Sequence, residues 1–323
     1  MSIRTIAVLS SGGDAPGINP CIRSVVRTAL YHGLEVLGIE EGYDGLIHGD
    51  MRPLSARDVS GIMHQGGTFL RTARCEEFKQ RLGQRKGLRE LNEASVDGLV
   101  VIGGDGSMHG VHALAELGFP VVGAPASIDN DITGTDMALG VDTALNTIMD
   151  SIDKLRDTAS SHQRVFLVET MGRNCGYLAL ISGVIGGAEL ILIPERDMDM
   201  DTIVNEIEDA YDRGKTHAII VAAEGASLKV NDVAKFLQDH EVGFEPRVTI
   251  LGHVIRGGSP SAFDRMLGTR MGVRAVEGLI NGKTDVMVGL QGNKIAYAPL
   301  EEVLAAPRQP NLDYYDMAEI LAR

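Results

Sequence analysis

The chain has 323 residues, of which 44% are hydrophobic and 23% charged, a balance typical of a globular protein with room for two domains. Its formal net charge of −14 argues against a nucleic-acid or anionic-membrane partner, because such partners carry charge of the same sign. An anionic small molecule would therefore depend on local arginines, lysines and helix N-termini for its binding.

The cysteines and the apolar segments indicate the compartment. Cys21, Cys75 and Cys175 are an odd number and lie far apart, which excludes a disulfide framework and a paired-cysteine metal site and fits the reducing cytoplasm. The first residues, MSIRTIAVLSSGGD, resemble a buried strand rather than a signal peptide. Glycines and a glutamate interrupt the apolar stretch from Tyr177 to Pro194, so we expect a buried helix and then a buried strand there, and no membrane span.

Short apolar runs rich in β-branched residues alternate with longer amphipathic segments along the chain. The first repeat is a strand at 3–9, a helix from Ile18 to Tyr31 with Gly33 as its stop, and a strand at 34–39. Further strands are expected at 98–102, 120–123, 165–168, 190–193, 218–221, 248–251 and 286–290. This βαβ pattern predicts an α/β protein with parallel sheets covered by helices on both faces, and the break after IDNDITGTD places a lobe boundary near residues 134–140.

Two glycine loops each follow a predicted strand and precede a predicted helix. The first is SGGDAPG at 11–17, and the second is GGDGS at 103–107, where the helix continues through Leu117. Glycine lets a polyphosphate approach backbone N–H groups at a helix N-terminus without obstruction by Cβ atoms. Two such loops at the carboxyl edge of one sheet suggest that they share one long phosphate donor.

Asp105 lies inside the second glycine loop. A carboxylate repels phosphate unless a cation lies between them, so Asp105 is a candidate ligand for Mg²⁺. The same loop also fits a tight turn with a capping aspartate. The sequence lacks GxxxxGK[ST], and GGDGSMHG does not have GxGxxG spacing, which excludes a P-loop and argues against a dinucleotide-dependent dehydrogenase.

The segment ASIDND follows the strand expected at 120–123 and brings two carboxylates near the second glycine loop. Phosphoryl transfer to an alcohol requires a group that accepts the hydroxyl proton, and Asp129 is the candidate. Asp131 would bias the pKa of Asp129 or hold a metal. An Asx-rich turn is the alternative interpretation of the same pattern.

Two further motifs, MGRNCG and GHVIRGG, each follow a predicted strand and carry one arginine. Arg173 and Arg256 would thus lie at the carboxyl ends of strands, where an arginine can bind phosphate through two hydrogen bonds. A salt bridge to one of the 44 acidic residues is the alternative for either arginine. On the predicted first helix, Arg23 and Arg27 lie one turn apart on the face opposite the apolar stripe.

Eight motifs occur together in an order and spacing that resembles bacterial ATP-dependent 6-phosphofructokinases: SGGDAPGIN, GGTFLRTAR, VVIGGDGS, IDNDITGTD, RDTASSHQR, MGRNCG, AAEG and LGHVIRGGSP. The resemblance covers nearly the whole chain and becomes thinner after Pro299. It implies the phosphofructokinase fold, with two Rossmann-like three-layer lobes and largely parallel sheets. The nucleotide-binding lobe would comprise 1–138 plus 252–300, and the sugar-phosphate-binding lobe 139–251 plus 301–323.

The resemblance also implies transfer of the γ-phosphoryl group of ATP to the 1-hydroxyl of fructose 6-phosphate, with Mg²⁺ on Asp105 and Asp129 as the base. Catalytic roles would then fall to Asp129, Asp131, Ser127, Arg173 and Gly13. The residues that would bind MgATP are Gly13, Arg74, Cys75, Gly104, Asp105, Gly106 and Ser107. Those that would bind the sugar phosphate are Ser127, Ile128, Asp129, Arg164, Met171, Gly172, Arg173, Glu224, Arg247, His253 and Arg256.

Family members are homotetramers, so Arg164 and Arg247 would reach the substrate site of a neighbouring subunit. The family also has an effector site for ADP or phosphoenolpyruvate. The residues that match it are Arg23, Arg27, Arg156, Gly187, Glu189, Arg213, Lys215 and His217.

Some positions depart from the family pattern. Cys75 stands where an aromatic side chain often covers the nucleotide, and Ala126 stands where pyrophosphate-dependent relatives tend to carry Lys. Gly106 retains the residue that those relatives replace with Asp, which favours ATP as the donor. A pyrophosphate-dependent phosphofructokinase and a non-catalytic sugar-phosphate sensor remain the alternatives.

Overall fold

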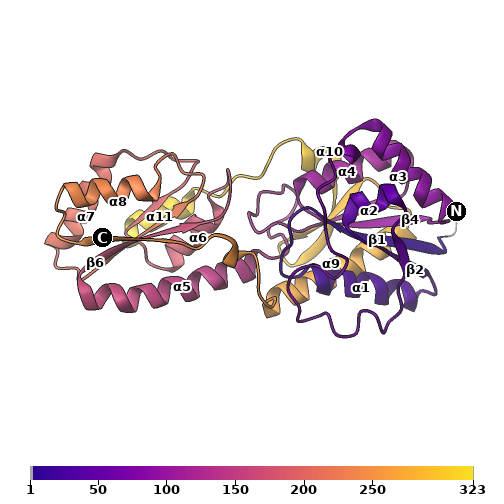
Figure 1. The fold of residues 1–323 in the computed structure, drawn as a ribbon, viewed down its shortest axis with the longest axis horizontal. Coiled ribbons are helices and arrows are strands. Elements are labelled where there is room, and N and C mark those ends of the chain that lie inside the picture. Colours follow the sequence, from indigo (N-terminus) through magenta and orange to yellow (C-terminus); the bar gives the residue numbers. More distant parts are fainter. Residues whose placement is uncertain (1–2, 323) are drawn as a thin grey trace. The chain divides into compact units, whose positions relative to one another are not determined.

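Alternating strands and helices build an α/β fold in each of two units of the chain (Figure 1). The computed structural model describes residues 3–322. Unit 1 comprises the chain up to Ile128 together with 132–143 and 256–308, and unit 2 comprises 129–131, 144–255 and the chain from Gln309 onward. Relative to the ranges expected from the sequence, residues 139–143 and 301–308 lie in unit 1, and 129–131 and 252–255 lie in unit 2.

Unit 1 contains a seven-stranded sheet in the order β11-β10-β5-β4-β1-β2-β3. Its strands are β1 (Thr5–Ser11), β2 (Glu35–Ile39), β3 (Met51–Pro53), β4 (Gly98–Gly103), β5 (Val121–Pro125), β10 (Val286–Gln291) and β11 (Lys294–Pro299). The five strands β10, β5, β4, β1 and β2 are parallel, and the edge strands β3 and β11 are antiparallel to their neighbours. Every residue of β4 is buried, as expected for a central strand with both faces covered.

Helices cover both faces of this sheet. They are α1 (Ile18–Tyr31), α2 (Gly42–His48), α3 (Arg81–Glu93), α4 (Asp105–Glu116), α9 (Ala262–Ile280) and α10 (Leu300–Leu304), with a 3₁₀ turn at Glu77–Lys79. Alternate residues of the central strands, such as Leu9, Leu99 and Val101, join one core cluster with side chains of α2, α3 and α4. On the opposite face α1 packs along α9 (Figure 1).

Unit 2 contains a four-stranded, fully parallel sheet in the order β7-β8-β6-β9. The strands are β6 (Arg164–Thr170), β7 (Leu190–Leu192), β8 (Ala218–Ala223) and β9 (Glu245–Ile250). Its helices are α5 (Val141–His162), which begins in unit 1, α6 (Tyr177–Ile185), α7 (Met200–Asp212), α8 (Val230–Asp239) and α11 (Asp313–Leu321), with a 3₁₀ turn at Gly252–Ile255. One face of the sheet forms a core with α7 and α8, and α11 packs against α6.

The predicted fold class, the parallel sheets and the first helix are confirmed. Helix α1 spans Ile18–Tyr31, and Gly33 follows it with a φ of 74°, a left-handed conformation that suits glycine. The apolar stretch from Tyr177 to Pro194 divides into α6 and β7. No helix among residues 3–322 is both long enough and apolar enough to cross a membrane.

The two antiparallel edge strands were not predicted. Strand β11 pairs with β10 through a tight hairpin in which Gln291 lies opposite Lys294 and Gly292 has a φ of 56°. The two intervening residues, Gly292 and Asn293, are a typical signal for such a turn. Strand β3 has only three residues and ends in Pro53, so its sequence pattern is too short to be recognised.

Candidate functional site

The two glycine loops lie side by side in unit 1. Strands β1 and β4 are parallel neighbours with Ser11 opposite Gly103, so the loops that follow them leave the same edge of the sheet. The Ser107 hydroxyl donates a hydrogen bond to the Ser11 carbonyl oxygen at 3.1 Å. A Cβ on Gly12 would lie 3.4 Å from the Ser107 Oγ, which shows how closely the loops approach. The expectation that both loops share one carboxyl edge is confirmed.

The second loop has the geometry expected of a phosphate cradle. Gly104 is the N-cap of α4, and Asp105 is the first helical residue. A Cβ on Gly106 would meet no protein atom within 4 Å, so packing within the chain does not require glycine at this position. An open approach to the first backbone N–H groups of a helix suits an anion.

Asp105 is well placed to meet a cation at this cradle. Its side chain is 57% exposed, and its carboxylate lies 3.7 Å from Nδ1 of His109, one turn further along α4. Nδ1 of His109 also lies 3.2 Å from the Asp105 carbonyl oxygen. Among residues 3–322 no group of three or more histidine, cysteine, aspartate or glutamate side chains is arranged to hold a metal ion.

Arg256 lies over the first glycine loop. Its Nη1 donates a hydrogen bond to the Asp14 carbonyl oxygen at 3.1 Å, and a Cβ on Gly13 would lie only 2.3 Å from the same nitrogen. We expected Arg256 at the carboxyl end of the strand that precedes it, but its side chain lies at the carboxyl end of β1 instead. The six-residue separation from the end of β9 allows the chain to pass from unit 2 into unit 1. His253, in the 3₁₀ turn just before Arg256, is exposed and belongs to unit 2.

A long loop between β3 and α3 lies next to the first glycine loop. The Thr72 hydroxyl donates to the Gly12 carbonyl oxygen at 2.8 Å, and the Ser10 hydroxyl donates to the Arg71 carbonyl oxygen at 3.0 Å. Arg74, which is exposed, and Cys75 follow Thr72 in the same loop between β3 and α3. The Cys75 side chain packs against the core cluster, and burial raises the pKa of its thiol.

The carboxylates of the third motif follow β5. Strand β5 is the parallel neighbour of β4, and the Ala126 N–H donates to the Gly103 carbonyl oxygen at 2.8 Å. Ile128 is fully buried, and Asp129 is 5% exposed. Asn130 between the two aspartates has a φ of 54°, so the chain turns sharply here. Ser127 and Asp131 are partly buried.

In unit 2 the loop from Met171 to Gly176 lies beside Glu224. The Arg173 N–H donates to Glu224 Oε1 at 2.9 Å, and the Glu224 N–H donates to the Thr170 carbonyl oxygen at 2.9 Å. Parallel pairing of β6 and β8 accounts for this proximity, because Thr170 and Ala223 are opposite each other at their carboxyl ends. The Arg173 side chain is exposed.

Gly172 and Cys175 approach each other closely within the same loop. Gly172 has a φ of 144°, and a Cβ there would lie 2.4 Å from the Cys175 carbonyl oxygen. Burial raises the pKa of the Cys175 thiol to about 11, with further contributions from the charges of Glu195, Asp131 and Asp129. Asp129 and Asp131 belong to unit 2, as this loop does.

Arg164 and Arg247 lie away from that loop. Both form ion pairs with Glu245, Arg164 at 3.0 Å and Arg247 in closer contact, and these pairs lower the pKa of Glu245. Arg164 begins β6, whereas the loop follows the other end of the strand. Thr170 lies six positions after Arg164, or roughly 20 Å along an extended strand. The structure therefore does not bring these two arginines to the same-chain loop.

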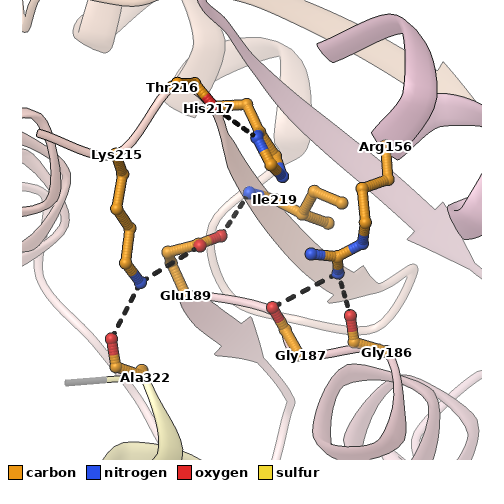
Figure 2. Close-up of polar contacts among 9 residues, drawn as sticks. All are labelled: Arg156, Gly186, Gly187, Glu189, Lys215, Thr216, His217, Ile219 and Ala322. Carbon is orange, nitrogen blue, oxygen red and sulfur yellow. Dashed lines mark hydrogen bonds and ion pairs between the residues drawn. The ribbon is translucent and has the colours of Figure 1, made fainter. Parts of the chain in front are cut away.

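Five of the eight predicted effector residues form one cluster in unit 2 (Figure 2). The Lys215 Nζ lies 3.3 Å from the Glu189 Oε1 and donates to the Ala322 carbonyl oxygen at 2.9 Å. Arg156 donates to the carbonyl oxygens of Gly186 and Gly187. Glu189 is only 9% exposed and also accepts a hydrogen bond from the Ile219 N–H. Burial lowers the pKa of His217, which faces the cluster.

The other three effector candidates do not belong to this cluster. Arg213 is exposed at the end of α7. Arg23 and Arg27 lie on α1 in unit 1, where Arg27 donates to the Ala56 carbonyl oxygen at 3.3 Å. The Arg23 Nε is buried without a hydrogen-bond partner in the described chain. The contact of Lys215 with the C-terminal segment was not anticipated, since no motif marks residues after Pro299.

Comparison with known proteins gives a consistent result. The family described as "Phosphofructokinase" matches residues 5–279. The chain is 51% identical over 320 residues to a protein of Halalkalibacterium halodurans named "ATP-dependent 6-phosphofructokinase", covering 99% of this chain and 100% of that protein. It is 52% identical over 321 residues to a protein of the same name from Thermotoga neapolitana, again covering 99% and 100%.

Solved structures show the same likeness. The crystal structure of Pichia pastoris phosphofructokinase in the T-state matches 94% of this chain with 36% identity and a TM-score of 0.90. This chain spans 36% of the length of that yeast chain. A pyrophosphate-dependent phosphofructokinase from Marinobacter aquaeolei matches 99% of this chain and 92% of its own with a TM-score of 0.87, and at 20% identity it supports the fold alone. The chain belongs to the phosphofructokinase family.

Proposed function

We propose that this chain is an ATP-dependent 6-phosphofructokinase, a kinase that transfers the γ-phosphoryl group of ATP to the 1-hydroxyl of fructose 6-phosphate. The observation that carries the proposal is the identity of about 50% over the full length to bacterial proteins named for this activity. The geometry of unit 1 supports it. Two glycine loops meet at one sheet edge, and the loop with the aspartate base candidate follows the next strand.

The nucleotide phosphates would bind along the glycine loops. Gly104 is the N-cap of α4, Gly106 and Ser107 lie in its first turn, and Gly13 adds backbone from the neighbouring loop. The open space at Gly106 favours ATP, because an aspartate there would place a charge and four further heavy atoms beside the phosphates. Arg74 and Cys75 would lie at the other end of the nucleotide.

The exposed carboxylate of Asp105 suits Mg²⁺, an ion that characteristically takes one or two protein carboxylates together with substrate phosphates. When bound, Mg²⁺ would neutralise charge on the transferring phosphoryl group.

The reaction would then proceed as an in-line transfer. Asp129 accepts the proton of the 1-hydroxyl while the new O–P bond forms, and the bond from the γ-phosphorus to the bridging oxygen breaks to release ADP. Its low exposure excludes water from the base. Arg173 and Arg256 provide positive charge for the transferring group or the sugar 6-phosphate.

The remaining sugar-site residues would hold the second substrate. Glu224 fixes the backbone of Arg173 and faces the sugar hydroxyls, with the backbone of Met171 and Gly172 beside it. Arg164 and Arg247, which lie far along β6 and β9 from that loop, would serve a neighbouring subunit of a homotetramer. Ser127, Ile128, Asp131 and His253 complete the proposed set.

The cluster of Arg156, Glu189, Lys215 and His217 would bind an anionic effector, either ADP or phosphoenolpyruvate. Two cations, Arg156 and Lys215, gather there with the His217 imidazole and a nearly buried carboxylate in a protein with a net charge of −14. We also propose that the enzyme acts in the cytoplasm, because its three cysteines are free and its substrates are sugar and nucleotide phosphates.

The test is a coupled assay of purified protein with fructose 6-phosphate and Mg²⁺, comparing ATP with pyrophosphate at equal concentration. We expect fructose 1,6-bisphosphate with ATP only. Turnover with pyrophosphate alone would assign the chain to the pyrophosphate-dependent enzymes, and turnover with neither donor would indicate a sugar-phosphate sensor.

A further inference from the structure

Asp264 is a fully buried carboxylate that the reaction scheme does not use. It lies in the first turn of α9 and is 0% exposed. Its Oδ1 accepts a hydrogen bond from the Gly140 N–H at 2.9 Å, and its Oδ2 accepts from the Thr143 N–H at 2.8 Å and from the Thr143 hydroxyl at 2.5 Å. An ionised carboxylate is an acceptor only, and here both of its oxygens face donors.

Asp264 binds backbone groups at the end of the loop from Ala126 to Leu139, which carries the proposed base. Leu139 donates its N–H to the Pro125 carbonyl oxygen at 3.0 Å, so the two ends of the loop from Ala126 to Leu139 meet. Gly140 follows directly. A Cβ on Gly140 would lie 2.7 Å from the Ala15 Cβ and 3.2 Å from the Ile128 Cγ2, so its backbone packs under both loops.

The same region of α9 contacts the end of the first glycine loop. A Cβ on Gly17 would lie 3.3 Å from the Asp264 carbonyl oxygen and 3.4 Å from the Asp264 Cβ. Further along α9, a Cβ on Gly268 would lie 2.6 Å from the Gly17 carbonyl oxygen. Asp264 thus touches SGGDAPG on one side and holds the end of the loop from Ala126 to Leu139 on the other.

We propose that Asp264 is a positioning residue for phosphoryl transfer, which sets the loop bearing Ser127 and Asp129 relative to the glycine loop that receives the nucleotide. The inference rests on the proposed function, and it goes beyond that function by assigning a role to a side chain that touches neither substrate. Ile128 is the link, because it packs on Gly140 and immediately precedes Asp129.

The chemistry of the contact requires a carboxylate. An asparagine would turn an amide NH₂ toward either the Gly140 N–H or the Thr143 N–H, and two donors repel each other in a buried site. Burial raises the pKa of Asp264 to about 6, and the charge of Asp142 adds to this effect, so keeping an ionised group here is costly. A neutral residue that merely filled the space would avoid that cost.

The decisive variant is Asp264→Asn, measured with its kinetic constants and its melting temperature. A displacement of about 1 Å between reacting groups costs on the order of 100-fold in rate, so we expect kcat to fall roughly 10- to 100-fold. The KM for ATP should stay within about twofold of wild type, since the Gly104–Ser107 cradle does not depend on Asp264.

Asp97→Asn is the matched control. The Asp97 carboxylate also accepts two backbone N–H bonds, from Arg4 at 2.7 Å and Thr5 at 3.0 Å, but at the opposite end of the same sheet. We expect this variant to keep wild-type kcat. If Asp264→Asn retained wild-type kcat, or if both variants lost kcat equally, the positioning role would be wrong.

If Asp264→Asn does not fold, Thr143→Val decides the question, because it removes one donor to Asp264 and leaves the carboxylate in place. We expect a fall in kcat that Thr143→Ser restores, and unchanged kcat in Thr143→Val would overturn the inference. A wild-type protein that forms no fructose 1,6-bisphosphate would refute the proposed function, whereas normal wild-type turnover with active variants would refute only the role of Asp264.

Discussion

Asp129 combines low exposure with a position directly after a buried strand, and both properties suit a general base. At 5% exposure its carboxylate is shielded from bulk water, while the turn at Asn130 separates it from Asp131. The local pattern alone also fitted an Asx-rich turn, and the structure has a turn at Asn130, which is compatible with the proposed role of Asp129.

We expect Asp129→Asn to lower kcat by roughly 10² to 10⁴ with little change in the KM for fructose 6-phosphate, because a base acts mainly in the transition state. Steady-state kinetics over a range of both substrates measures this. Near-normal kcat in the folded variant would exclude Asp129 as the base.

Gly106→Asp tests the choice of phosphoryl donor. A side chain at this position would enter the open space beside the cradle and carry negative charge toward the nucleotide phosphates. We expect the KM for ATP to rise at least about tenfold. Gly61→Asp is the control, because a Cβ on Gly61 also meets no protein atom within 4 Å but this position has no proposed role. Equal effects of the two substitutions would contradict the assignment.

The raised pKa of Asp264 predicts that the stability of the folded chain depends on pH. Its folded pKa of about 6 exceeds the ordinary value of 3.8, so the folded chain binds this proton more tightly than the unfolded chain does. The free energy of unfolding contributed by this group is therefore greatest below about pH 4 and decreases as the pH rises toward 6, by about 3 kcal/mol in total.

Melting temperatures of wild type and Asp264→Asn between pH 4 and 7 provide the measurement. We expect the wild type to lose stability relative to the variant as the pH rises through this window, and to show a constant difference above it. A difference that did not change with pH would show that the pKa of Asp264 is not raised in the folded chain.

The candidate functional residues lie mainly in the loops that follow the strands. In unit 1 the carboxyl ends of β1, β4 and β5 deliver three motifs to one edge because these strands are adjacent and parallel. In unit 2 the adjacency of β6 and β8 brings Arg173 to Glu224. The parallel βαβ pattern could be recognised in the sequence, so the shared sheet edge could be predicted.

The cluster of Figure 2 combines residues of α5, of the segments just before β7 and β8, of β8 itself and of the C-terminal segment. It leads to a separate prediction. Lys215→Ala should abolish the response to added ADP, measured as the shift in KM for fructose 6-phosphate, because Lys215 supplies a cation next to Glu189. Lys235→Ala, on the exposed face of α8, should respond to ADP as the wild type does. An unchanged response in Lys215→Ala would exclude this cluster as the effector site.

For the assembled enzyme, the placement of Arg164 and Arg247 makes the strongest prediction. If these arginines complete a neighbour's site, Arg247→Ala and Asp129→Asn damage a shared site from opposite subunits. Mixing the two inactive variants under conditions that exchange subunits should restore part of the activity, because some hybrid sites then have both wild-type residues. Failure to restore activity, with exchange verified, would place both residues in a single-chain site.

Much of the fold and the site followed from local pattern. The strand–glycine–helix signals, the position of α1 and the aspartates after β5 depend on residues close together in the chain, where periodicity and turn chemistry are decisive. The antiparallel edge strands were missed because β3 is very short and β11 follows β10 after a turn of only two residues, Gly292 and Asn293.

What sequence alone could not supply are the contacts between distant segments. Arg256 lies on Gly13, 243 positions earlier, and Asp264 holds Gly140 and Thr143 through bonds that span 124 and 121 positions. Such pairings depend on how α9 packs against α1 and on where the chain crosses between units, and no local periodicity encodes either. Residue types and spacing therefore predicted the chemistry of the motifs, whereas only long-range packing showed that the buried Asp264 carboxylate binds Gly140 and Thr143.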